Sequence, residues 1–217
     1  MLRCVALPLA ACLLVAGGWF PAFAGSVVEL TPIVGYRHGG STRETGSGAD
    51  ADIQGSPVYG LILDIKARED GQYEFIYTHQ STELDAKDSY TTPYQEPPKF
   101  DTGLQIDTIQ AGGLLFLTPG TTTRPYIAMT LGASLVEPQD SDLSGGTYFS
   151  GSFAGGVKLY PSENATVRLE ARGYGILVSD SSEIACSSGR GGGVCFVGAT
   201  GGAIWKIEAS VGLALRF

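Results

Sequence analysis

The residues whose types and spacing best suit catalysis are His79 and Ser81, which a single glutamine separates, and Glu83, which follows two positions later. A histidine that removes the proton of a serine hydroxyl makes the serine a nucleophile, and a carboxylate can orient the imidazole ring. In an extended strand, residues two apart lie on one face, with Cα atoms roughly 6.5–7 Å apart. The spacing therefore permits a serine hydrolase site, and the alternative is a polar end to a row of aromatic side chains.

This pair is similar to the His/Ser pair of the outer-membrane lipid A deacylases. In that family the histidine deprotonates the serine and a carboxylate orients the ring. The position differs, because that family carries its pair late in the chain, and the residues around His79 and Ser81 do not match its pattern. The resemblance implies a lipid A-modifying hydrolase only as an alternative to a protein that is not an enzyme.

A second set of residues combines charge with strict alternation. Over residues 166–177, Arg168, Glu170 and Arg172 alternate with apolar residues, which indicates a strand whose charged face lines a lumen. When the same alternation is applied to all predicted strands, charged residues of both signs are assigned to the lumen. They are Glu29, Asp64, Lys66, Arg68, Glu74, Lys158, Arg168, Glu170, Arg172, Lys206, Glu208 and Arg216. An eight-stranded barrel has an interior just wide enough for side chains, and buried charges must be paired. We therefore predict a salt-bridged plug, with a narrow conduit for small or apolar solutes as the alternative.

Two cysteines, Cys186 and Cys195, lie close together in a stretch rich in glycine and serine. In an exported protein they are predicted to form one disulfide that staples a loop. A metal site is the competing interpretation, but this stretch lacks histidines and further cysteines. The sequence therefore predicts no metal and no cofactor.

The start of the chain is typical of an export signal. A short basic region is followed by an apolar run, and Ala-Phe-Ala at positions 22–24 forms a cleavage site. We predict a signal peptide over residues 1–24 and one domain over residues 25–217. Lipid attachment to Cys12 is an alternative, but too little apolar sequence precedes this residue. No later stretch reaches the roughly 18 consecutive apolar residues of a membrane-spanning helix.

The end of the chain alternates strictly between two kinds of residue. Counting back by twos from Phe217 gives an apolar row as far as Trp205, and the positions between are polar or small. This pattern, the aromatic last residue and the export signal together predict the closing strand of a transmembrane β-barrel. Phe217, Leu215 and Leu213 are predicted to form the signal that the barrel-assembly machinery recognises.

Alternation along the rest of the chain predicts eight strands, with short turns at one end and long polar loops at the other. Their ranges are about 27–37, 57–68, 72–80, 104–117, 124–134, 148–160, 166–177 and 205–217. The facing of residues 104–117 is left open, because their alternation is weak. The fold class is all-β, an eight-stranded antiparallel up-and-down transmembrane β-barrel. A secreted soluble β-sandwich would not explain the unequal loops or the terminal aromatic residue.

Acidic residues exceed basic residues by 22 to 14, and the formal net charge is −8. This balance excludes nucleic acid as a partner, because nucleic-acid binding needs clustered lysine and arginine. Most of the excess lies in the predicted loops, at Glu44, Asp50, Asp52, Glu83, Asp85, Asp88, Glu96, Asp101, Glu137, Asp140, Asp142, Asp180 and Glu183. These carboxylates are expected to keep the loops hydrated, or to share divalent cations with lipopolysaccharide phosphates. A wide diffusion porin is excluded, because it needs about 16–18 strands.

Three segments resemble the small outer-membrane barrel superfamily that includes OmpX, OmpW and the opacity proteins. They are Arg124-Pro125-Tyr126-Ile127-Ala128 with Gly132, the glycine-rich residues 151–157, and the closing residues 211–217. The resemblance covers essentially residues 25–217. It implies the outer membrane of a Gram-negative-type cell, extracellular loops, and contact with outer-membrane lipid and lipopolysaccharide. That superfamily includes adhesins, stress-response proteins and suspected small-solute conduits. The leading hypothesis is a non-enzymatic, charge-plugged barrel that serves envelope integrity or surface interaction.

Overall fold

The computed structural model describes residues 27–44, 50–86, 101–118, 122–139, 145–162, 164–177, 183–187, 194–197 and 203–217. The predicted signal peptide, residues 1–24, lies outside these ranges, and so does Cys12. Among the described residues, no helix has the length and apolar character needed to cross a membrane.

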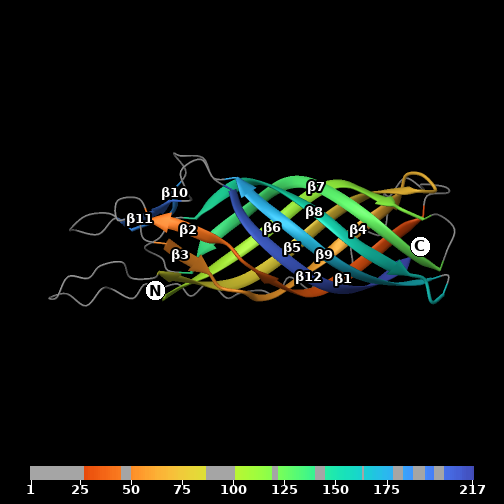
Figure 1. Ribbon diagram of the computed structural model, residues 1–217, viewed down its shortest axis with the longest axis horizontal. Helices are drawn as coiled ribbons and strands as arrows, with labels where there is room; N and C mark the ends of the chain where they lie inside the picture. Colours follow the sequence, from red (N-terminus) through yellow and green to blue (C-terminus); the bar gives the residue numbers. More distant parts are fainter. Residues whose placement is uncertain are drawn as a thin grey trace, which may run out of the picture.

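Eight long strands form a closed antiparallel barrel (Figure 1). In chain order they are β1 (Val28–His38), β4 (Ser56–Lys66), β5 (Gly71–Ala86), β6 (Asp101–Phe116), β7 (Thr123–Pro138), β8 (Gly146–Leu159), β9 (Ala165–Leu177) and β12 (Ala203–Arg216). Each pairs with the next along the chain, and the last pairs with the first. The predicted up-and-down barrel is therefore confirmed.

Strands β12 and β1 close the barrel through a continuous register. Leu215 pairs with Leu30, and Val211 pairs with Val34. Beyond the end of β12, the amide of Phe217 donates to the carbonyl of Val28 at 2.9 Å, and the amide of Val28 donates back at 3.2 Å. Closure leaves no unpaired edge among these eight strands, as a bilayer requires.

Four shorter strands continue the sheet beyond one end of the barrel, which we call the extended end (Figure 1). They are β2 (Ser41–Glu44), β3 (Asp50–Ile53), β10 (Glu183–Ser187) and β11 (Val194–Val197). We predicted loops here, because the polar sequence shows no apolar alternation. Their backbone groups pair anyway, β3 with β5 and β2 with β11. Gly39 and Gly40, with φ values of 93° and 114°, allow the chain to bend from β1 into β2.

The opposite end of the barrel, which we call the turn end, carries the short connections β4–β5, β6–β7 and β8–β9. Along the strands, buried side chains alternate with exposed ones. In β6, whose facing the sequence left open, Ile106 and Leu114 point inward, while Ile109 and Leu115 point outward. The outer wall is a band of large exposed apolar side chains that suits contact with lipid tails.

Apolar side chains also fill parts of the lumen. At the extended end a buried cluster contains Ile53, Leu104, Ile106, Val136, Tyr148, Ile176 and Ile204. A second cluster, at the turn end, contains Leu114, Phe116, Tyr126, Ala128 and Ala154. A third, between them, contains Ile33, Ile62 and Ile76. Apolar clusters and charged side chains therefore share the lumen.

Candidate functional site

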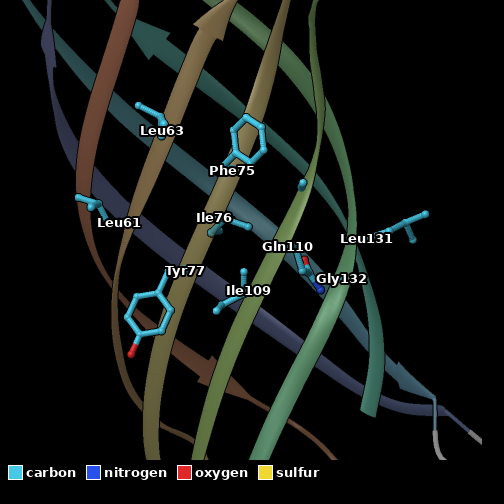
Figure 2. A pocket seen from close by; sticks show the side chains of 10 residues that line it. Leu61, Leu63, Phe75, Ile76, Tyr77, Ile109, Gln110, Leu131 and Gly132 are labelled. Atoms are coloured by element: carbon cyan, nitrogen blue, oxygen red, sulfur yellow. The ribbon is translucent and has the colours of Figure 1, made fainter. Parts of the chain in front are cut away.

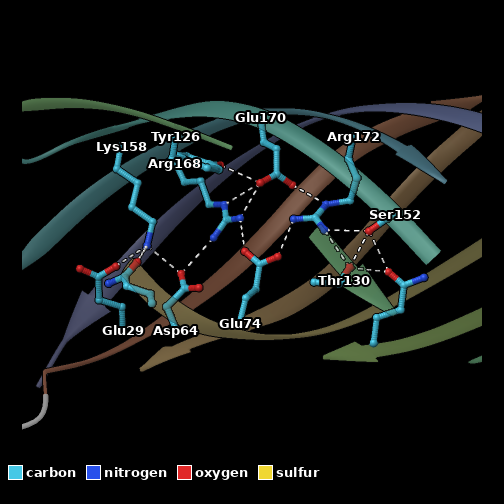
Figure 3. Close-up of polar contacts among 12 residues, drawn as sticks. Glu29, Asp64, Glu74, Tyr126, Thr130, Ser152, Lys158, Arg168, Glu170 and Arg172 are labelled. Carbon is cyan, nitrogen blue, oxygen red and sulfur yellow. Dashed lines mark hydrogen bonds and ion pairs between the residues drawn. The ribbon is translucent and has the colours of Figure 1, made fainter. Parts of the chain in front are cut away.

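Lys158 of β8 stands at the centre of the first group of polar contacts in the lumen. Its Nζ donates to Glu29 Oε2 at 2.6 Å, to Asp64 Oδ2 at 2.7 Å and to Gln72 Oε1 at 2.7 Å. These acceptors come from β1, β4 and β5, on the opposite wall (Figure 3). One ammonium group thus uses all three of its protons to tie four strands together.

Two arginines of β9 extend this group toward the extended end (Figure 3). Arg168 donates to Asp64 Oδ2 at 2.9 Å and also binds Glu74 and Glu170. Arg172 donates from Nη2 to Glu74 Oε1 and from Nε to Glu170 Oε1, each at 2.7 Å. Glu74 and Glu170 therefore each bridge the two guanidinium groups, with one carboxylate oxygen to each arginine. Hydrogen bonds between charged groups of this kind are stronger than those between neutral groups.

Hydroxyl and amide groups continue the contacts along the lumen. Arg172 Nη1 donates to Ser152 Oγ at 2.9 Å, and the Ser152 hydroxyl donates to Gln110 Oε1 at 2.8 Å. Nearer the extended end, Arg37 donates to Glu208 Oε2 from Nε at 2.9 Å and from Nη2 at 2.6 Å. Lys206 is buried nearby, and its Nζ donates to Gln80 Oε1 at 3.3 Å.

The buried charges of the lumen balance. The carboxylates are Glu29, Asp64, Glu74, Glu170 and Glu208, and the cations are Arg37, Lys158, Arg168, Arg172 and Lys206. We call these ten side chains the lumen network. Buried charges are tolerated when they are paired and hydrogen-bonded. The contacts above pair nine of the ten with an opposite charge, while the contact of Lys206 is to the amide oxygen of Gln80.

The prediction of which charges face the lumen was wrong near the turn end of the barrel, where β4 ends. Arg68 is exposed, because β4 ends at Lys66 and Arg68 lies in the hairpin. Lys66 is only partly buried and binds the exposed Glu69 at 2.7 Å, and this hydrogen bond lowers the pKa of the Glu69 carboxyl. Arg216 lies at the rim, with Nε 3.6 Å from Glu29 Oε1. Arg37 was missed, although it has the same parity as Glu29 on β1.

A second cluster of polar groups lies on the outer wall. The Nδ1 of His79 lies 2.8 Å from Asp107 Oδ1, and the Nε2 of His79 lies 3.3 Å from Ser81 Oγ. Asp107 takes the place that we predicted for Glu83. The reason is register: β5 pairs His79 directly with Asp107 and pairs Glu83 with Gly103. Sequence alone does not give this cross-strand pairing.

Three further side chains hold this cluster in place. The hydroxyl of Tyr77 donates to Asp107 Oδ1 at 2.8 Å, and Gln105 Nε2 donates to Asp107 Oδ2 at 2.9 Å. The ring of Tyr59 lies tilted against the His79 ring, with 4.9 Å between centroids. We call Ser81, His79, Asp107, Tyr77, Gln105 and Tyr59 the wall cluster.

A groove of about 490 Å³ lies beside the wall cluster, toward the turn end (Figure 2). Its lining is almost entirely apolar and includes Leu61, Leu63, Phe75, Tyr77, Ile109, Ala111 and Leu131. The larger of these side chains point away from the barrel, and Ala111 leaves room between them. Tyr77 belongs to both features, since its ring lines the groove and its hydroxyl binds Asp107.

The two cysteines face each other in the backbone register. Strands β10 and β11 are antiparallel, and Cys186 pairs directly with Cys195. The disulfide between them stays a prediction.

No family model matches the sequence, and no curated protein matches it significantly. Solved structures do match the fold. The outer membrane protein OprG of Pseudomonas aeruginosa matches 89% of this chain and 96% of its own, with a TM-score of 0.62 and 11% identity. The outer membrane protein AlkL matches 88% of this chain and 89% of its own, with a TM-score of 0.55 and 10% identity. This chain therefore has the fold of the small eight-stranded outer-membrane β-barrels.

Proposed function

We propose that this protein is an outer-membrane barrel whose lumen does not conduct, and that it serves envelope integrity or surface interaction through its extended end and its outer wall. The observation that carries the proposal is the lumen network, in which Arg168 and Arg172 of β9 share Glu74 of β5 across the interior and Glu170 on their own strand. A conducting lumen would need a continuous row of solvated groups. Here most of the charged side chains bind one another instead.

The apolar layers at both ends of the lumen support the same proposal. Ile53, Leu104 and Ile204 belong to the cluster at the extended end, and Phe116 and Tyr126 belong to the cluster at the turn end. Arg124 lies over the Phe116 ring, with its guanidinium carbon 3.6 Å from the centroid. A solute would have to displace these packed side chains and break charge pairs on its way through the lumen. The alternative, a narrow conduit for small or apolar solutes, therefore requires a rearranged lumen.

The outer membrane is the location that the fold supports, because the solved structures that share it include outer membrane proteins. We place the extended end outside the cell, since bacterial barrels carry longer extracellular loops and short periplasmic turns. Its acidic loop residues would then face lipopolysaccharide, and divalent cations could link the two sets of anions. The barrel-assembly machinery would insert the chain by way of its terminal strand.

Single-channel recording tests the proposal. The refolded barrel, residues 25–217, is added to a planar bilayer, and heat-dependent gel mobility verifies folding of the same sample. We expect no reproducible open steps from the natural sequence or from Lys66→Ala, which changes a charge outside the lumen network. Open steps whose conductance changes in Arg168→Ala but not in Lys66→Ala would overturn the proposal and favour a conduit.

A further inference from the structure

We propose that the wall cluster is a hydrolytic site, in which Ser81 is the nucleophile, His79 is the general base and Asp107 orients the imidazole ring. The substrate class is a long-chain acyl ester of a membrane lipid, with its acyl chain in the apolar groove beside Tyr77. This activity would use the outer wall, and it is independent of whether the lumen conducts.

The contacts define a complete path for a proton. When Nδ1 of His79 carries a proton, it donates to Asp107 Oδ1 at 2.8 Å, and Nε2 is left as an acceptor. The hydroxyl of Ser81 lies 3.3 Å from that Nε2 and donates to it. Residue types, order and distances match the arrangement of serine hydrolases, in which geometry rather than sequence position defines the triad. Apo sites commonly show a long serine–histidine contact that tightens on substrate binding.

Asp107 is held more firmly than a hydrated surface carboxylate would be. Oδ1 accepts from His79 and Tyr77, and Oδ2 accepts from Gln105. Its side chain is only 19% exposed and that of His79 only 14%. Three donors from two strands fix the direction of the carboxylate, and the Tyr59 ring against His79 fixes the plane of the imidazole. The two groups are thus preorganised for one tautomer of His79.

The groove supplies a second, independent reason to place a lipid here. Tyr77 precedes His79 by two positions on β5, and Ile109 follows Asp107 by two positions on β6, so both side chains share the outward face. These two residues form the near end of the groove, and Phe75 and Leu63 lie farther along it (Figure 2). The groove therefore begins directly beside the histidine–aspartate pair, and its lining is almost entirely apolar.

The distance along β5 between Ser81 and the groove sets the length of the acyl chain that the site can bind. From Ser81 to Tyr77 is four residues, or about 13 Å at the rise of an antiparallel strand. An ester carbonyl at Ser81 would send its acyl chain past His79 before the chain reaches the groove. Only a long acyl chain can span this distance and still fill the groove, which points to a membrane lipid rather than a small ester.

The position across the membrane fits an ester at the boundary of the hydrocarbon layer. Outward side chains of β5 change from aromatic at Tyr73, Phe75 and Tyr77 to polar at His79 and Ser81. Lipid esters lie at this kind of boundary, between the acyl chains and the polar headgroups, so Ser81 would meet the carbonyl without entering the hydrocarbon.

The reaction is an ordinary two-step ester hydrolysis. Ser81 Oγ bonds to the ester carbonyl carbon while His79 Nε2 takes the serine proton. The carbon–oxygen bond to the alcohol then breaks, and the alcohol leaves with that proton. Water, deprotonated by His79, attacks the acyl-serine, which releases the fatty acid and returns the proton to Ser81. One ester and one water give one alcohol and one acid, and no metal or redox partner takes part.

Labelling with a fluorophosphonate tests the nucleophile in the refolded barrel. We expect covalent labelling of Ser81, located by mass spectrometry of the peptide, and no labelling of Ser81→Ala. His79→Ala should slow labelling on the order of 10³-fold. Asp107→Asn should slow it strongly, while Asp107→Glu should restore part of the rate, as a purely structural role would not. Glu83→Gln is the matched control, because Glu83 is exposed on the same strand outside the cluster. A folded natural barrel that is not labelled at Ser81 overturns the proposal.

A second experiment identifies the lipid. Fatty acid release is measured with vesicles of phospholipid alone and, separately, with vesicles that contain lipopolysaccharide. Release from the first identifies a phospholipid ester, and release only from the second identifies an ester of lipid A. Release from neither, with Ser81 still labelled, overturns the assignment to a lipid ester.

The groove can be tested without touching the catalytic residues. Ala111→Phe fills the groove, and its position on the outer wall permits a larger side chain there. We expect this variant to raise KM for long-chain p-nitrophenyl esters about 10-fold or more, with kcat and fluorophosphonate labelling retained. Met129→Phe is the control, because this outward residue does not line the groove. Unchanged selectivity for chain length in Ala111→Phe would contradict the role of the groove.

Discussion

Arg168 reaches across the lumen to Asp64, with Nη1 2.9 Å from Oδ2, and both side chains are almost completely buried. The same guanidinium binds Glu74 and Glu170, so one cation contacts three carboxylates. The unfolded chain would hydrate all four groups. The network is therefore stabilising only while every member is present.

Replacement of Arg168 by methionine leaves the three carboxylates with too little positive charge. We expect Arg168→Met to lower the free energy of unfolding by about 3–5 kcal/mol, as for other buried pairs that lose one partner. Urea-dependent unfolding in lipid vesicles measures this loss. Lys66→Met removes the pair with the exposed Glu69 and should change the stability far less, because exposed ion pairs are screened by water and contribute little. Equal losses in the two variants would contradict the difference between buried and exposed pairs.

The sequence predicts much of this arrangement because lipid outside and charges inside impose a period of two on each strand. Arg168, Glu170 and Arg172 could be placed in the lumen from alternation alone. Lys66 and Arg68 could not be excluded, because alternation does not show where a strand ends. Asp107 was missed as the partner of His79, because β6 alternates weakly and its pairing with β5 is a tertiary property. The apolar layer around Ile53 and Leu104 arises where several strand ends meet, and no single segment encodes it.

Gly132, an inward-facing glycine of β7, shows how closely the wall of the barrel packs. A Cβ on Gly132 of β7 would collide with the carbonyl oxygen of Ile109 and lie 2.7 Å from the Cα of Gln110. Because these are backbone atoms, they cannot move aside without disturbing the β6–β7 pairing. We expect Gly132→Ala to cost about 1–3 kcal/mol or to reduce the refolding yield. Gly155→Ala is the control, since nothing lies within 4 Å of its added Cβ. Comparable folding of the two variants would contradict this account.

The register at the extended end predicts the redox state of the cysteines. Directly opposed residues in an antiparallel pair have Cα atoms about 4.5–5.5 Å apart, which lies within the range that disulfides span. Because Cys186 opposes Cys195, we expect the exported protein to resist alkylation at both residues until it is reduced. Mass spectrometry after alkylation, with and without prior reduction, measures this. Rapid alkylation of both thiols in the folded, unreduced protein would show that no bond forms.

A substitution at Phe217 can distinguish an effect on the stability of the barrel from an effect on its assembly in cells. Its side chain is 76% exposed, whereas its backbone closes the barrel against Val28. Phe217→Ala should therefore refold in detergent with a stability within about 0.5 kcal/mol of the natural sequence, as for surface changes in general. In cells we expect a lower yield of folded barrel in the outer membrane, because the assembly machinery would lose its aromatic signal. Heat-dependent gel mobility of membrane fractions and of refolded protein measures the two effects separately. Leu169→Ala on the outward face of β9 is the control, and equal membrane yields for both variants would contradict a recognition role for Phe217.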